Sequence, residues 1–161
     1  MSHGPVLFSQ DRGGQDGNVF TLLKFRTMIP NAEALTGPVF VDEEGDSRCI
    51  PGGKFIRRFS IDEFPQLWNV LKGDMSMVGP RPERAFFVET YIKTIPDFNY
   101  RHLLKPGITG WAQVNGRSVL TRRPEHKIKY DLYYIKNWTL LLDIKILFKT
   151  VFFVLLGIEA C

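Results

Sequence analysis

Two short runs near the start of the chain, residues 5–10 and 19–28, alternate apolar and polar positions. The segment between them is dense in Asp, Gly and Asn, which favour turns. Two such runs around a turn predict a β-hairpin with a longer loop. Lys24 and Arg26 alternate with apolar neighbours in the second run, so these cations share one face of the strand. That face is either simply solvated or a phosphate-binding surface.

Residues 60–73 carry the pattern of a helix. Ser60 can cap the first turn, and Glu63 stands where a capping box places the partner of the cap. Gly73 suits the end of the helix, whereas Pro65 lies close to the limit that a first turn tolerates. Apolar side chains recur at helical spacing, at Ile61, Phe64, Leu67, Trp68 and Leu71.

The rest of the chain predicts more helices than strands. Residues 29–53 form a weakly patterned connector that contains Pro and Gly, either a surface loop or a substrate lid. Further helices are expected at 82–93, 124–137 and 139–156, and a short strand at 111–114. The pattern predicts one α/β (α+β) domain over residues 1–161, with a small antiparallel sheet and several amphipathic helices.

The C-terminal segment, residues 139–158, has two distinct faces on a helical wheel. It suits either a core helix or an amphipathic helix that lies in the plane of a membrane surface. Its longest uncharged run, residues 150–158, is too short for a bilayer, which needs about 20 apolar residues. The polar arc holds Thr139, Asp143, Lys145, Lys149 and Thr150, and the apolar arc holds Leu141, Ile144, Phe148, Val151 and Leu155.

Composition narrows the class of protein. With 161 residues, 44% hydrophobic and 24% charged, the chain resembles an ordinary globular domain and is neither disordered nor fibrous. Its net charge of +4 suits anionic partners, yet no nucleic-acid-binding module is present and no nucleic-acid partner is expected. The isolated Cys49 and Cys161 argue against a disulfide scaffold. The three histidines, His3, His102 and His126, lack metal-ligand spacing.

The richest chemistry lies at Asp62 and Glu63, just after Arg57 and Arg58. Acidic residues in a first helical turn are sufficiently explained by the helix dipole. The same carboxylates can also attack phosphorus, handle protons or hold Mg²⁺ together with substrate phosphates. The arginines can bind a phosphate bidentately. This segment alone does not separate the structural interpretation from the functional one.

Four blocks of sequence resemble one family of enzymes. The chain is similar along almost its whole length to the bacterial sugar transferases, monotopic phosphoglycosyl transferases also called undecaprenyl-phosphate sugar phosphotransferases. The blocks are KFRTM at 24–28, SIDEFPQLWNVLKGDMSMVGPRPE at 60–83, KPGITGWAQVNGR at 105–117 and YDLYYI at 130–135. Four long blocks in the expected order are more specific than any short motif.

The resemblance implies a reaction and its partners. A sugar 1-phosphate would move from a UDP-sugar donor to a polyprenyl (undecaprenyl) phosphate acceptor, with release of UMP and with Mg²⁺ as cofactor. The product would initiate an exopolysaccharide, a capsule or an O-antigen. The resemblance also implies the cytoplasmic face of the bacterial inner membrane, a lipid surface as partner, and possible homo-oligomers or complexes with other glycan-assembly enzymes.

The resemblance also assigns residues. Asp62 matches the nucleophile that forms an aspartyl phosphosugar intermediate, and Glu63 matches its partner as a base or a metal ligand. Arg57 matches a phosphate-binding position and Asp131 an acidic position near the site. By position and chemistry, Arg81, Lys24 and Arg26 are further phosphate-binding candidates.

Family members carry a hydrophobic membrane segment ahead of the globular part, which these residues do not contain. We therefore expect the sequence to correspond to the catalytic part. A protein of another class remains open, namely a catalytically impaired, membrane-peripheral scaffold of a glycan-assembly complex. The intact Asp62, Glu63 and Arg81 favour the enzyme.

Overall fold

The structure is a computed structural model that describes residues 4–34, 37, 47–116, 120 and 123–157. The strands are β1 (Leu7–Gly13), β2 (Val19–Phe25), β3 (Ser76–Val78) and β4 (Gly107–Thr109). The α-helices are α1 (Gly53–Arg58), α2 (Gln66–Lys72), α3 (Ala85–Thr94), α5 (Pro124–Lys136) and α6 (Leu140–Leu156). Short 3₁₀ helices are η1 (Gln15–Gly17), η2 (Ile61–Glu63), η3 (Phe98–Leu103) and η4 (Gln113–Asn115). The predicted mixed fold is confirmed.

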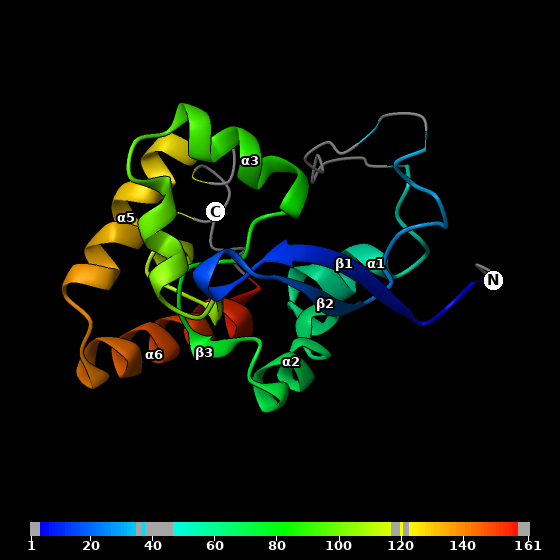
Figure 1. Ribbon diagram of the computed structural model, residues 1–161. Helices are drawn as coiled ribbons and strands as arrows, with labels where there is room; N and C mark the ends of the chain where they lie inside the picture. Colours follow the sequence, from blue (N-terminus) through cyan, green and yellow to red (C-terminus); the bar gives the residue numbers. More distant parts are fainter. Residues whose placement is uncertain (1–3, 35–36, 38–46, 117–119, 121–122, 158–161) are drawn as a thin grey trace.

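The predicted hairpin is confirmed, with a shorter loop than expected. Strands β1 and β2 pair antiparallel from Leu7 opposite Phe25 to Gly13 opposite Val19. Figure 1 shows this hairpin crossing the middle of the molecule, with α5 and α6 on one side and α1 and α2 on the other. Because η2 and α2 pack against β2, the face of the hairpin that bears Lys24 meets the acidic pair.

A second sheet was not predicted. Strands β3 and β4 pair in parallel, with Val78 opposite Thr109. The strand expected at 111–114 is wrong, since residues 113–115 form η4 and the strand lies earlier, at residues 107–109. This strand is too short and too rich in glycine for a sequence pattern to show it. It exists because its backbone lies directly against Gly79.

The helix expected from Ser60 to Gly73 is broken, so the predicted capping box is wrong. Ser60 has a left-handed backbone (φ 52°) and its side chain does not cap a helix. The segment forms η2 and then α2, which begins after Pro65. A proline lacks the N–H that a continuous helix needs, and its ring clashes with the preceding turn. The predicted end at Gly73 (φ 87°) is confirmed.

Two other helix predictions need correction. Helix α3 begins at Ala85 rather than at Pro82, because the carbonyls around residue 82 bond to other segments of the chain. Helix α1 was not predicted: it begins at the last residue of the predicted connector, and its six residues are too few to show a helical period. The part of that connector at 35–36 and 38–46 lies outside the described residues. Helices α5 and α6 are confirmed within a residue or two, and Thr139 caps α6 by accepting from the N–H of Leu142.

Helix α2 turns polar side chains inward and apolar ones outward, and α6 leaves one apolar face exposed. In α2 the buried residues are Gln66 and Asn69, whereas Leu67, Trp68 and Leu71 are exposed. Asn69 bonds the backbone of β2, accepting from Leu23 N at 3.1 Å and donating to Thr21 O at 2.9 Å. The apolar arc of α6, defined above, is 41–76% exposed. That arc therefore does not face the core, although α6 also acts as a core helix through Ile146, which is fully buried.

The polar arc of α6 faces the protein. Asp143 accepts a hydrogen bond from the hydroxyl of Tyr134 at 2.7 Å, and Thr150 bonds Thr109 at 2.6 Å. Lys145 and Lys149 lie over the ring of Trp111 at 5.6 and 5.3 Å. None of the helices in the described part of the chain is both long and apolar enough to cross a membrane.

The core is divided between two clusters. The first joins β3, η4, α5 and α6 and consists of Val78, Val114, Tyr134 and Ile146. The second joins η3 and α5 and consists of Ile95, Phe98 and Ile128. The loop after β3, which carries Arg81, is bonded to the hairpin through Arg12 and Gly13 of β1.

The close approach of β4 to Gly79 gives a test of the fold. A Cβ on Gly107 would overlap the backbone of Gly79 and Thr109. We expect Gly107→Ala to lower the free energy of unfolding by about 3 kcal/mol, measured by denaturant titration. Gly17→Ala is the matched control, because Gly17 has a left-handed backbone (φ 77°) but open space around it. Its expected cost is about 1 kcal/mol. Equal losses in both variants would contradict this account.

Candidate active site

The acidic pair lies in η2 and is almost fully buried. Asp62 is 7% exposed and Glu63 is 6% exposed. The left-handed residue before η2 and the proline after it break the chain direction, so the pair stands in a single turn between α1 and α2. A buried carboxylate must be neutralised or paired, because removal of its hydration is costly.

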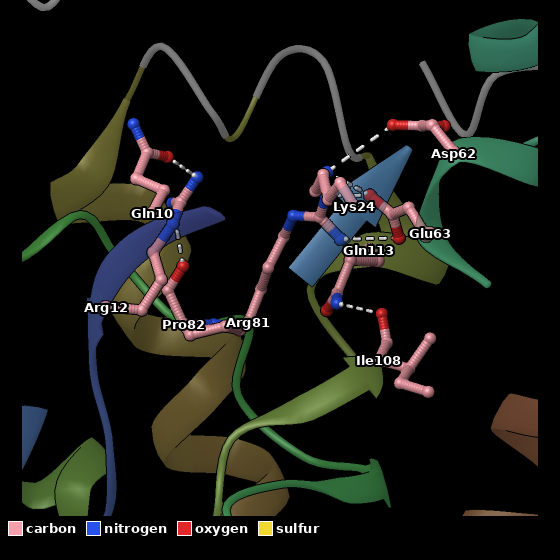
Figure 2. Close-up of polar contacts among 9 residues, drawn as sticks. All are labelled: Gln10, Arg12, Lys24, Asp62, Glu63, Arg81, Pro82, Ile108 and Gln113. Carbon is pink, nitrogen blue, oxygen red and sulfur yellow. Dashed lines mark hydrogen bonds and ion pairs between the residues drawn. The ribbon is translucent and has the colours of Figure 1, made fainter. Parts of the chain in front are cut away.

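Two cations from distant parts of the sequence converge on Glu63. Lys24 Nζ donates to Glu63 Oε1 at 2.8 Å and lies 3.6 Å from Asp62 Oδ2. Arg81 donates to both carboxylate oxygens, to Oε1 through Nη2 and to Oε2 through Nη1 at 3.3 Å. Figure 2 shows Lys24 and Arg81 meeting at Glu63 while Asp62 stands to one side. Glu63 therefore joins the hairpin to the loop after β3.

Burial and charge shift the pKa of both cations. Burial lowers the pKa of Lys24, and the carboxylate of Glu63 offsets only part of that effect. Burial also opposes the charge of Arg81, but the attraction of Glu63 outweighs it and raises the pKa of Arg81. Arg81 thus stays a guanidinium cation beside the acidic pair.

The loop that carries Arg81 is held at four consecutive carbonyl oxygens, those of residues 80–83. The first accepts from the N–H of Gly107 at 3.0 Å, and the second from Arg101 at 2.6 Å. The third accepts from Arg12 at 3.1 Å, and the fourth from the N–H of Gly13 at 3.0 Å. Two of the four residues are prolines, which fix the backbone further. We call this stretch the 80–83 segment.

A second buried charge cluster lies behind the 80–83 segment. Arg101 pairs with Asp131 at 2.9 Å and with Glu83 at 3.5 Å. Lys127 Nζ donates to Glu83 Oε1. The guanidinium of Arg101 also lies over the ring of Phe98 at 5.0 Å. The cluster connects η3 and α5 to the segment that presents Arg81.

The structure brings together only some of the residues predicted for the site. Asp62, Glu63, Lys24 and Arg81 form one group. Asp131 is 2% exposed and belongs to the second cluster, so it reaches the site through Arg101 and the carbonyl of Arg81. Burial raises the pKa of Asp131. Its predicted contact with substrate stays a prediction.

Two other predicted phosphate ligands lie outside the group. Arg26 donates to the backbone oxygens of Pro5 at 2.6 Å and Met28 at 3.2 Å, which ties down the start of β1. Arg57 is half-buried in the last turn of α1, one short turn before the acidic pair. Neither belongs to the ion pairs that join Glu63 to its cations.

The donor set fits Mg²⁺ in part. Both oxygens of Glu63 are engaged by Lys24 and Arg81, so Glu63 would have to lose a cation in order to ligate a metal. Asp62 can be the single protein carboxylate of a site completed by substrate phosphates, as Mg²⁺ commonly accepts. Within the described residues no group of three His, Cys, Asp or Glu side chains could hold a metal without substrate.

Comparison with known proteins identifies the family. The sequence model described as "Bacterial sugar transferase" matches residues 1–157. The chain belongs to the bacterial sugar transferase family. The match includes all the residues that form the acidic pair, its two cations and the second cluster.

Three relatives with curated descriptions are closely similar. The UDP-N-acetylgalactosamine-undecaprenyl-phosphate N-acetylgalactosaminephosphotransferase of Aeromonas hydrophila is 48% identical over 99% of this chain and 37% of its own length. The UDP-glucose:undecaprenyl-phosphate glucose-1-phosphate transferase of Escherichia coli is 44% identical over 94% of this chain and 33% of its own length. The uncharacterized sugar transferase EpsL of Bacillus subtilis is 47% identical over 91% and 68%. The chain thus spans about a third of the first two relatives.

Sequence reasoning missed four residues of this sugar transferase site. Each acts through backbone or paired charges, so no local motif marks it. The only available signal was the position of Glu83 inside the block at 60–83. The four are Arg12, Glu83, Arg101 and Lys127. Burial lowers the pKa of Arg12 to about 10, and the positive charge of nearby Arg81 contributes to this shift in the same direction.

Glu83 makes the second cluster sensitive to acid. Burial acts to raise its pKa, but the attraction of Lys127 and Arg101 prevails and lowers that pKa from 4.5 to about 2. A carboxyl whose folded-state pKa is depressed stabilises the fold above its unfolded-state pKa. This stabilisation is lost as the pH falls from about 4.5 toward about 2.

We therefore expect Glu83→Gln to make the free energy of unfolding less dependent on pH in the acid range. Between about pH 6 and pH 2.5, the unmodified chain should lose about 2 kcal/mol more of its free energy of unfolding than the variant. Urea titrations across this pH range measure the difference. Glu89→Gln, at an exposed carboxylate on α3, is the control and should keep the wild-type slope. An unchanged slope in Glu83→Gln would contradict the assignment.

Proposed function

We propose that this chain is the catalytic part of an enzyme that transfers a sugar 1-phosphate from a UDP-sugar to a polyprenyl phosphate and releases UMP. Two features support the proposal. Relatives at 44–48% identity carry the names of undecaprenyl-phosphate sugar phosphotransferases. The same chain buries two adjacent carboxylates beside two cations, which suits the handling of phosphate groups.

In the first step, an Asp62 carboxylate oxygen attacks the phosphorus atom that bears the sugar. A new O–P bond forms to Asp62 as the bond from that phosphorus to the bridging oxygen breaks, and the bridging oxygen leaves with UMP. The result is an aspartyl phosphosugar. Asp62 suits this role better than Glu63, since both Glu63 oxygens are already bonded to cations.

Lys24 and Arg81 would stabilise charge in this step. Lys24 Nζ lies 3.6 Å from Asp62 Oδ2, so it can neutralise negative charge on a diphosphate that binds next to Asp62. Arg81 is held by the 80–83 segment, so its guanidinium needs little reorganisation when charge develops. Glu63 orients both cations. Arg57 and Arg26 are outer candidates for the uridine diphosphate.

In the second step, an oxygen of the polyprenyl phosphate attacks the phosphorus held on Asp62. The bond from phosphorus to Asp62 breaks, and the carboxylate is regenerated while the lipid diphosphate sugar leaves. Asp62, together with substrate phosphates, would hold Mg²⁺, and the metal would neutralise part of the charge of the diphosphate. The two half-reactions predict ping-pong kinetics.

The observation that carries the proposal is the burial of Asp62 beside the clamped Glu63, and Asp62→Asn tests it. We expect the rate of UMP release from a panel of UDP-sugars, with Mg²⁺ and polyprenyl phosphate, to fall at least about 10³-fold. A label in the sugar should become covalently attached to the unmodified protein and not to the variant. Asp16→Asn is the control, because Asp16 is exposed and its left-handed turn position suits Asn. Full activity of a folded Asp62→Asn protein would refute the proposal.

We also propose that the outward apolar faces of α6 and α2 lie on a lipid surface, at the cytoplasmic face of the bacterial inner membrane. The two helices carry exposed leucine side chains, with tryptophan on α2 and phenylalanine on α6, and these expose more apolar surface than a free monomer usually does. A helix that lies in the interface plane places its apolar face among the acyl chains. The lipid acceptor requires such contact.

Phe148→Ser tests this contact. Phe148 is 74% exposed on the apolar arc of α6, so its loss should spare the fold and weaken partition into anionic lipid vesicles by roughly tenfold. Co-sedimentation measures the partition coefficient. Phe86→Ser, at a residue 70% exposed on α3, is the matched control and should sediment as the unmodified chain does. Equal effects of the two substitutions would contradict the assigned face.

A further inference from the structure

A cavity of about 220 Å³ lies beside the acidic pair. We propose that it holds the isoprene units next to the phosphate of the acceptor, with that phosphate at Lys24 and Arg81. The inference rests on the proposed function, since it assigns a place to one of the two substrates. The occupant is a short stretch of branched, unsaturated hydrocarbon that ends in a phosphate.

The cavity is polar at one end and apolar along its walls. Glu63 and Arg81 border the polar end. Leu67 of α2 lines the cavity, as do Phe153 and Val154 of α6. An amphiphile with an anionic head matches this division, because its head meets the cations while its hydrocarbon leaves water. The volume suits a few carbons of the lipid and not the whole chain.

The cavity opens toward the surface that we assign to the membrane. Phe64, Leu67 and Met77 line it and are also 60%, 46% and 42% exposed. At another edge Arg58 donates to the carbonyl of Gly157 at 3.2 Å, which joins the C-terminal ends of α1 and α6. A lipid can therefore pass from the apolar surface into the cavity without crossing a polar barrier at the exposed edge.

The polar groups of the cavity walls argue against the nucleotide as the occupant. The hydroxyls of Thr109 and Thr150 bond each other at 2.6 Å. The amide nitrogen of Gln113 donates to Ile108 O at 3.4 Å, so only its buried Oε1 is left as an acceptor. A uridine and a sugar need several placed hydrogen-bond partners, and these three wall side chains are already bonded within the protein. Hydrocarbon needs none.

Binding of farnesyl phosphate, a 15-carbon prenyl phosphate, tests the site without requiring turnover. Titration calorimetry of the 161-residue chain, with inorganic phosphate and UMP as comparison ligands, measures the affinities. We expect farnesyl phosphate to bind more tightly than inorganic phosphate. Val154→Trp fills the cavity from α6, and Leu67→Trp fills it from α2. Each should weaken farnesyl phosphate about tenfold or more and leave UMP unchanged.

Matched controls lie on the same two helices. Leu155 and Leu71 are 75% and 79% exposed and do not line the cavity, so Leu155→Trp and Leu71→Trp should bind farnesyl phosphate as the unmodified chain does. The inference is overturned if farnesyl phosphate binds no better than inorganic phosphate, if all four variants behave alike, or if the cavity variants weaken UMP instead. A different outcome is that UMP release does not depend on Asp62 while farnesyl phosphate binding still depends on the cavity. That outcome would reject the proposed reaction and retain the lipid subsite.

Discussion

The burial of Glu63 is the constraint on which the rest of the structure depends. A carboxylate that is 6% exposed must be paired, and the two cations that pair with it come from β2 and from the loop after β3. Its ion pairs therefore fix the hairpin, η2 and that loop relative to one another. Both oxygens of Glu63 bond cations, which is why the proposed reaction assigns the nucleophile to its neighbour Asp62.

The same requirement extends to the loop that supplies Arg81. A guanidinium can neutralise developing charge at low cost only when it is already in place. Bonds to four consecutive carbonyls and the pairs of Arg101 with Glu83 and Asp131 meet this need. The second cluster does not touch the acidic pair, yet it determines where Arg81 stands. Residues of the second cluster would therefore affect a reaction by fixing the position of Arg81.

Helices α2 and α6 connect the site to its surroundings. Asn69 of α2 bonds to the hairpin and Thr150 of α6 bonds to β4, while each helix leaves an apolar face exposed. The cavity between them reaches from Arg81 to exposed Phe64 and Leu67. This arrangement places the buried charges and an exposed apolar surface close together, as the proposed transfer onto a lipid phosphate would require.

The sequence by itself determined the hairpin, α5, α6, the family and the candidate residues Asp62, Glu63, Lys24 and Arg81, because these features depend on local patterns and motifs. Only the tertiary structure decided that Ser60 breaks a helix, that residues 107–109 form a parallel strand, and that Asp131 acts on Arg101. It also decided which faces of α2 and α6 point outward. The reason is physical: a helical wheel shows that a face is apolar, but whether that face meets the core or the surface depends on partners distant in the chain.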